Sequence, residues 1–128
     1  MQELPNLSKA EYDILRTLWK GGRKTVREVH DQIQSTTGWA YTTTKTMMDR
    51  MVKKELLVRE EFHGVFLYHP LVSRPAGLAK MVQFFADRVL ETDASTVVSM
   101  FAGGTLSDEE IQELQDLLAS DDDKESDK

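Results

Sequence analysis

The chain has 128 residues, of which 40% are hydrophobic and 30% charged, a composition typical of a globular protein. It contains no cysteine, which excludes disulfides, thiolate metal sites and cysteine nucleophiles. No apolar run reaches the roughly 18 residues that a membrane-spanning helix needs, and Met1–Asn6 lacks the features of a signal peptide. We therefore expect a cytoplasmic protein without membrane insertion.

The formal charge of −6 is unevenly distributed. Residues 1–70 carry 11 lysines and arginines against nine aspartates and glutamates, which gives +2. Residues 71–128 carry five against 13, which gives −8. This asymmetry is typical of a nucleic-acid-binding half joined to a half with another role.

Two capped helices are predicted in the first 40 residues. Ser8-Lys9-Ala10-Glu11 has the form of a capping box, and the helix that it opens ends at Gly21-Gly22. Thr25-Val26-Arg27-Glu28 is a second capping box, before a helix that ends near Ser35. A turn is then predicted at residues 35–38. The apolar positions with helical spacing are Tyr12, Ile14, Leu15, Leu18 and Trp19 in the first helix and Val26, Val29 and Ile33 in the second.

A third helix is predicted from about Tyr41 to Lys54, and its two faces differ in character. One face is suited to packing and carries Thr44, Met47, Met48 and Met51. The opposite face is polar and carries Thr42, Lys45, Thr46, Asp49, Arg50 and Lys53.

Two short strands follow, over residues 56–61 and 65–70, with a turn at residues 62–64. Three helices followed by a β-hairpin is the order of a winged helix-turn-helix. We therefore predict a mainly α protein with a small β-hairpin, in which residues 7–70 form a winged-helix DNA-binding domain.

The polar face of the third helix suits the major groove. Threonine hydroxyls and lysine can reach base edges, while Arg50, Lys53 and Lys54 are placed to contact phosphate. Asp49 either pairs with a lysine four residues away or accepts from a cytosine, and we favour the pairing.

Two further residues near the predicted DNA surface allow alternatives. Tyr41, at the start of the third helix, either contacts DNA or covers the core. His63, at the hairpin tip, either touches phosphate or the minor groove or lies in solvent.

The second half of the chain is predicted to be helical. Ser73-Arg74-Pro75 marks a boundary, and helices are expected over 76–91 and 94–101. Ser107-Asp108-Glu109-Glu110 is a third capping box. Residues 75–119 thus form a helical region, while the charged tail at 120–128 is expected to be disordered. The apolar stripes are Leu78, Met81, Val82, Phe85 and Val89 in the first helix and Ile111, Leu114, Leu117 and Leu118 in the last.

Several stretches resemble the BlaI/MecI/CopY-type, or penicillinase repressor, family. Gly38–Lys54 resembles its recognition helix, with the tryptophan, two spaced threonines and the final cations in register. The other anchors, in order over about residues 7–119, are Leu7–Glu11 with Leu18-Trp19, Leu67–Pro70, Ser95–Phe101 and Leu106–Leu114.

This resemblance implies a homodimeric repressor that binds a pseudo-palindromic operator through its winged helices. It implies that DNA is contacted by Thr42, Thr43, Lys45 and Thr46, and that Arg50 and the wing support this binding. The C-terminal helices would form the dimer interface, through Leu78, Met81, Val82, Phe85, Val89, Val97, Val98, Phe101, Ile111, Leu114 and Leu118.

The resemblance also bears on how the repressor is switched. Members that respond to β-lactams are cleaved at an Asn–Phe bond, which implies a membrane sensor protease as partner. The aligned pair here is Met100–Phe101, in which methionine replaces asparagine. The copper-responsive branch senses metal through cysteines, which this chain lacks.

Other classes of function have little support in the sequence. His30, His63 and His69 lack the spacing of metal ligands, and we expect no metal and no cofactor. Phosphate loops and nucleophile elbows are absent, so we expect no catalytic residues and no enzyme. The alternative is a winged-helix protein-interaction module that does not bind DNA.

Overall fold

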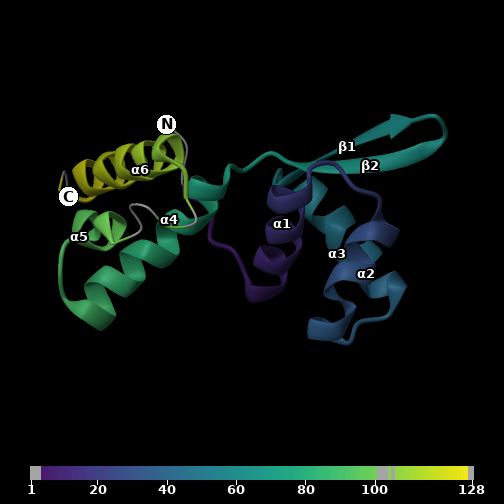
Figure 1. Cartoon of the computed structure of the whole chain (residues 1–128), viewed down its shortest axis with the longest axis horizontal. Coiled ribbons are helices and arrows are strands. Elements are labelled where there is room, and N and C mark those ends of the chain that lie inside the picture. The colour runs from purple at the N-terminus through teal and green to yellow at the C-terminus, as the bar shows by residue number, and fades with distance from the viewer. Residues whose placement is uncertain (1–3, 101–103, 105, 127–128) are drawn as a thin grey trace. The chain divides into compact units, whose positions relative to one another are not determined.

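The computed structural model describes residues 4–100, 104 and 106–126, which form two compact units. One unit is Leu7–Ser73, and the other combines the described residues of 1–6 with those of 74–128 (Figure 1). None of the helices within the described ranges is long and apolar enough to cross a membrane.

The unit Leu7–Ser73 is a winged helix-turn-helix, as predicted. Three helices precede a two-stranded antiparallel hairpin, whose register runs from Leu57 opposite Pro70 to Phe62 opposite Val65. A single bridge between Lys24 and Tyr68 joins the α1–α2 connection to the hairpin. The elements are α1 (Lys9–Gly21), α2 (Val26–Thr37), α3 (Tyr41–Lys53), β1 (Leu57–Phe62) and β2 (Val65–Pro70).

Both predicted capping boxes at the start of this unit are present. The Ser8 hydroxyl accepts from the Glu11 amide at 3.2 Å, and Thr25 accepts from Glu28 at 3.1 Å. Helix α2 continues two residues beyond the predicted end near Ser35, so of the predicted turn at 35–38 only Gly38 lies outside the helix. The helix ends there because Gly38 adopts a left-handed φ of 69° and donates to the Gln34 carbonyl at 2.8 Å.

The core of this unit forms where the apolar faces of the three helices meet the base of the hairpin. The Trp19 indole at its border donates to the Val72 carbonyl at 2.8 Å, which ties the end of the unit to α1. The buried hydrophobic residues are Ile14, Leu15, Leu18, Val26, Val29, Ile33, Met48, Met51, Leu56, Leu57 and Tyr68.

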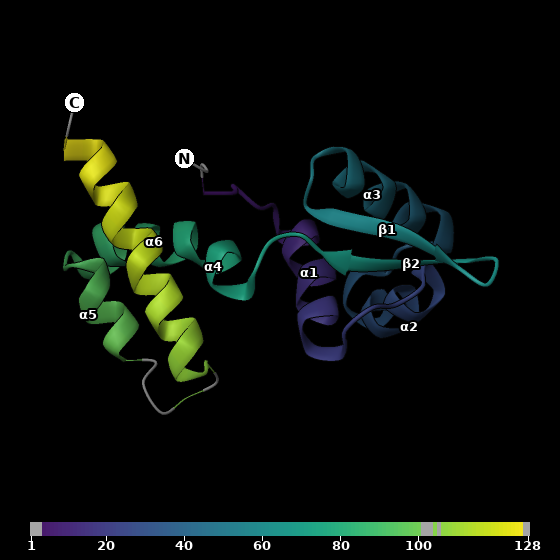
Figure 2. The same ribbon diagram turned by 90° about the horizontal axis from the view of Figure 1, so that it is seen from above.

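The secondary-structure elements in the described part of the second unit are all helices. Its elements are α4 (Arg74–Phe84), the π-helix η1 (Phe85–Leu90), α5 (Ala94–Ser99) and α6 (Asp108–Ser126). Figures 1 and 2 show α5 and α6 lying against α4. In place of the single helix predicted over 76–91, an α-helix begins two residues earlier and continues as the π-helix η1. The residue after η1 is Glu91, which adopts a left-handed φ of 53°.

Helix α6 is held at its start by two interactions. The third predicted capping box is present, since Ser107 Oγ accepts from the Glu110 amide at 3.1 Å. Arg74 of α4 also donates to the Glu110 carboxylate, at 2.9 Å from Nε and 2.6 Å from Nη2. The helix then continues to Ser126, into the segment for which composition predicts disorder.

Candidate DNA-binding surface

One face of α3 is open to solvent and carries the side chains predicted to contact DNA. Its exposed residues are Thr42, Thr43, Lys45, Thr46, Arg50 and Lys53. Four of them, with Met47, line a hollow in the surface of the helix: Thr42, Thr43, Thr46 and Arg50. The N-cap residue is Ala40, which makes no side-chain cap hydrogen bond, while its carbonyl accepts from the Thr43 and Thr44 amides at 3.1 and 3.2 Å. The start of the helix is therefore not covered by a capping side chain, and helix starts favour anions such as phosphate.

The opposite face of α3 packs against α2. Thr44, Met48 and Met51 are buried, as predicted, and Met47 is half-buried. Buried polar groups need partners, and Thr44 Oγ1 lies 2.9 Å from Nδ1 of the buried His30 on α2. This hydrogen bond is one of the contacts that orient α3 on the unit.

Tyr41 belongs to this packing contact. The half-buried ring meets the His30 ring edge-on, with centroids 5.8 Å apart. The Arg27 guanidinium lies 4.4 Å from the centroid of the Tyr41 ring. Tyr41 thus packs against the core, as one of its two interpretations expects, and its contact with DNA stays a prediction.

Asp49 is the centre of an ion-pair network between α3 and the hairpin. Its carboxylate accepts from Lys45 Nζ at 3.0 Å and from the Tyr68 hydroxyl at 3.1 Å, and Arg59 Nη1 lies 3.6 Å away. Burial raises the pKa of Asp49, but the hydrogen bonds from Lys45 and Tyr68 and the nearby cations outweigh it and lower the pKa overall. The pairing with Lys45 is as predicted.

Arg59 and Tyr68 are members of this network that the sequence did not reveal. They face each other in the hairpin register. The backbone of Tyr68 is in turn bonded to Lys24, at 2.8 and 3.1 Å. Tyr68 therefore joins the α1–α2 connection, the wing and α3, which no local spacing in the sequence could indicate.

Lys54 differs from the other cations at the end of α3. Its Nζ pairs with the buried carboxylate of Glu11 on α1. Burial raises the pKa of Glu11, but hydrogen bonds from Lys54 and Ser8 lower it overall. Lys54, predicted to contact phosphate, thus also ties α3 to α1, and like Arg50 and Lys53 it is exposed.

The tip of the wing is apolar rather than basic. His63 adopts a left-handed φ of 50° and its ring meets Phe62 edge-on, at 4.2 Å between centroids. Phe62, Val65 and Phe66 are all about half exposed. His63 therefore lies in an exposed turn among apolar side chains.

The predicted dimer residues fall into two groups in the helical unit. One group is enclosed in the unit's own core and consists of Val82, Val97, Val98, Leu114 and Leu118, with Leu78 and Ile111 half-buried. The other group is exposed on α4 and η1 and consists of Met81, Phe85 and Val89, next to the exposed Phe84 and Leu90. Phe101 lies outside the described residues.

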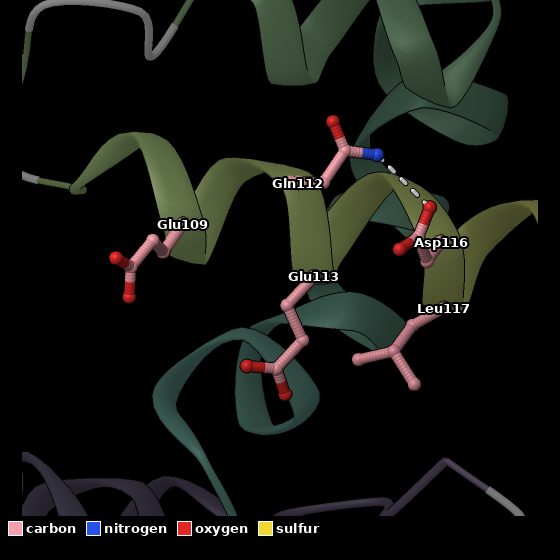
Figure 3. Close-up of a pocket in the computed structure, with 5 residues that line it drawn as sticks. All are labelled: Glu109, Gln112, Glu113, Asp116 and Leu117. Carbon is pink, nitrogen blue, oxygen red and sulfur yellow. Dashed lines mark hydrogen bonds between the residues drawn. The ribbon is translucent and has the colours of Figure 1, made fainter.

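A further hollow lies along α6 and has the wrong charge for DNA. It is lined by Glu109, Gln112, Glu113, Asp116 and Leu117. Figure 3 shows Glu113 and Leu117 pointing to the same side of the helix, while Gln112 donates to Asp116 at 3.0 Å. Carboxylates here would repel phosphate. Among the residues that the structure describes, no three histidine or acidic side chains gather as a metal site.

Comparison of sequences relates most of the chain to one group of proteins. The profile of the penicillinase repressor family matches residues 7–120. The penicillinase repressor of Bacillus licheniformis is 29% identical over 119 residues, which cover 92% of this chain and 93% of that protein. The methicillin resistance regulatory protein MecI of Staphylococcus aureus is 26% identical over 113 residues, which cover 88% and 92%.

Two solution structures are similar to part of the chain. One is the Bacillus licheniformis BlaI monomeric form in complex with the blaP half-operator, with a TM-score of 0.52 and 29% identity over 59% of this chain and 93% of that one. The other is the DNA-binding domain of the repressor BlaI, with a TM-score of 0.50 and 30% identity over 58% and 90%.

Proposed function

The chain belongs to the penicillinase repressor family, and on that premise we propose that it represses transcription by binding an operator through α3. The family assignment confirms the resemblance seen in the sequence, and it removes the case for an enzyme. The observation that carries the proposal is the exposed face of α3, which combines threonine hydroxyls and cations on a fold shared with a half-operator complex.

The residues on this face divide by their place along the helix. Near its start, Thr42, Thr43, Lys45 and Thr46 present hydroxyls and an amine to base edges in the major groove. Further along, Arg50 and Lys53 meet phosphate and set the register of the helix without reading bases.

We further propose that the repressor acts in the cytoplasm as a homodimer. Two copies would bind half-sites about one helical turn apart. The apolar side chains exposed on α4 and η1 supply a surface that a second copy can cover, since large exposed apolar patches mark interaction sites. In this arrangement Met81, Phe85 and Val89 form the contact, and the enclosed residues of the unit support it from behind.

We also propose that a membrane sensor protease releases the repressor from DNA by cleaving it. Met100 is 65% exposed and follows α5 as its C-cap residue, so the bond to Phe101 begins at an accessible position. Cleavage there would remove part of the dimerisation region. Incubation with the partner protease, followed by mass spectrometry, would locate the cut.

The DNA-binding proposal is tested with the full chain and two paired variants. Lys45→Ala with Arg50→Ala removes two cations from α3, and we expect it to abolish salt-sensitive retention of duplex DNA in mobility-shift gels. Arg16→Ala with Lys20→Ala removes two exposed cations from α1 and serves as the matched control. If the parent protein itself binds no DNA, the interaction-module alternative is favoured instead.

A further inference from the structure

Asp49 is the only acidic residue on α3, and it lies on the face that we assign to DNA. A carboxylate there repels phosphate, so its presence among threonines and cations needs a physical reason. Its partners supply one, because the same carboxylate contacts Lys45 on α3 and Arg59 on the wing.

The two cations that pair with Asp49 belong to different elements, and each matters to DNA binding for a different reason. Lys45 belongs to the first half of α3, where base contacts are expected. Arg59 is the only lysine or arginine in the wing between residues 57 and 70. The Arg59 guanidinium lies 4.7 Å from the centroid of the Phe66 ring, so it is placed between that ring and the carboxylate. Asp49 therefore pairs with one cation from each of the two elements, α3 and the wing, that we expect to face DNA.

The two ion pairs of Asp49 are weaker than its hydrogen bond from Tyr68. The side chains of Lys45 and Arg59 are 53% and 42% exposed, and ion pairs at such positions are weak enough for a phosphate to replace. The hydroxyl of Tyr68, in contrast, comes from a buried side chain. Asp49 is thus held by Tyr68 independently of its two cations.

Holding a cation in this way affects the two kinds of DNA binding unequally. Binding to arbitrary sequence depends on cations that neutralise phosphates, and a cation already paired contributes less. Lysine has three donors, so Lys45 can keep Asp49 as a partner and still donate to a base edge. Base reading is therefore retained while phosphate binding is reduced.

We propose that Asp49 is a specificity-determining residue that weakens binding to non-operator DNA more than binding to the operator, by holding Lys45 and Arg59 in ion pairs. This inference rests on the proposed function of α3 as the operator-reading helix. Its consequence is that removing the charge of Asp49 makes the protein a tighter but less discriminating DNA binder.

Asp49→Asn is the variant that tests this role. Asparagine has nearly the same shape and can still accept from Tyr68, so the fold should be kept. Two titrations are compared for parent and variant: a fluorescein-labelled 30-base-pair duplex of random sequence, and the duplex that the parent enriches from a randomised library. We expect the variant to bind random duplex about tenfold more tightly at 0.1 M salt, with a salt slope steeper by about one per cation released.

Two controls separate the proposal from simpler explanations. Asp31→Asn makes the same change in net charge at an exposed position of α2, and we expect it to have a smaller effect. Tyr68→Phe removes the hydroxyl but leaves the ion pairs, and we expect random-duplex affinity to stay within about twofold of the parent. Thermal unfolding of each variant confirms that it is folded.

The outcomes are distinct. If Asp49→Asn leaves random-duplex affinity unchanged while the parent enriches a specific site, the inference is overturned. Loss of operator affinity confined to one base pair would instead show that Asp49 accepts from a cytosine. If the parent enriches no sequence at all, the proposed function fails, whatever the effect at Asp49.

Discussion

His30 and Thr44 make a buried contact between α2 and α3, with Nδ1 of His30 2.9 Å from Oγ1 of Thr44. The two side chains lie 14 positions apart and satisfy each other where water does not reach. Because α3 is the helix that faces DNA in our proposal, this hydrogen bond links the stability of the unit to the orientation of the contact surface.

Thr44→Val should destabilise the winged-helix unit. Valine fills the same space but leaves the His30 nitrogen without its partner, which costs about 1–3 kcal/mol. Urea denaturation of the full chain measures the change. Thr43→Val makes the same substitution at the exposed neighbour and should shift the midpoint much less. Equal shifts for the two variants would argue against a special role for the hydrogen bond.

Lys54→Ala should reduce stability more at neutral pH than in acid. The folded pKa of Glu11 lies below its ordinary value of 4.5, so the stability that the pair contributes is present above that pH and is lost as pH falls through the folded pKa. Since Lys54 is 57% exposed, we expect a loss of only about 1–2 kcal/mol at pH 7.

Urea midpoints at pH 7 and pH 4 test this, with Lys53→Ala as control. The difference between parent and Lys54→Ala should narrow at the lower pH. A variant of unchanged stability but weaker DNA binding would instead support the phosphate contact that the sequence predicts for Lys54.

Glu110→Gln should make the helical unit less dependent on pH. Hydrogen bonds from Arg74 and from the Ser107 amide lower the pKa of Glu110 to about 2. The stabilisation is therefore present above the unfolded pKa near 4.5 and disappears as pH falls towards 2. We expect a loss of about 1 kcal/mol at pH 7, discounted for solvent screening, and a loss that vanishes as pH falls through the folded pKa. Thermal scans across this range compare it with Glu109→Gln, and parallel curves for both variants would contradict the assignment.

Thr46→Ala should weaken operator binding more than binding to random duplex. Thr46 is exposed, lines the hollow on α3, and offers both a hydroxyl and a methyl to the bases. Loss of one base contact corresponds to about 1–3 kcal/mol, or roughly fivefold to 150-fold, at the operator. Fluorescence titrations against both duplexes measure the ratio. An equal loss on the two would place Thr46 against the backbone.

Phe85→Asp should yield monomers with reduced operator affinity. Phe85 is 43% exposed on the apolar surface of η1, and a charge there would be buried without a partner in a dimer. Sedimentation velocity gives the oligomeric state, with Lys80→Asp on the exposed side of α4 as control. A Phe85→Asp protein that remains a dimer would move the interface elsewhere.

The local spacing of residues was enough to predict the helix caps, the packed face of α3 and one ion pair. The three capping boxes, the packed face that holds Thr44 and Met48, and the Lys45–Asp49 pair all depend on residues three or four positions apart. The helical repeat brings such residues together wherever the helix lies. The family resemblance depended on the same short patterns.

Tertiary structure decided the contacts between residues far apart in the chain. Glu11 meets Lys54 across 43 positions, and Arg59 reaches Asp49 only because the hairpin register sets it opposite Tyr68. Periodicity placed Val82 and Phe85 on one apolar stripe, but the packing of α5 and α6 against α4 buries Val82 and leaves Phe85 exposed. A stripe shows that a face is apolar, whereas the partner that covers it depends on how separate elements pack.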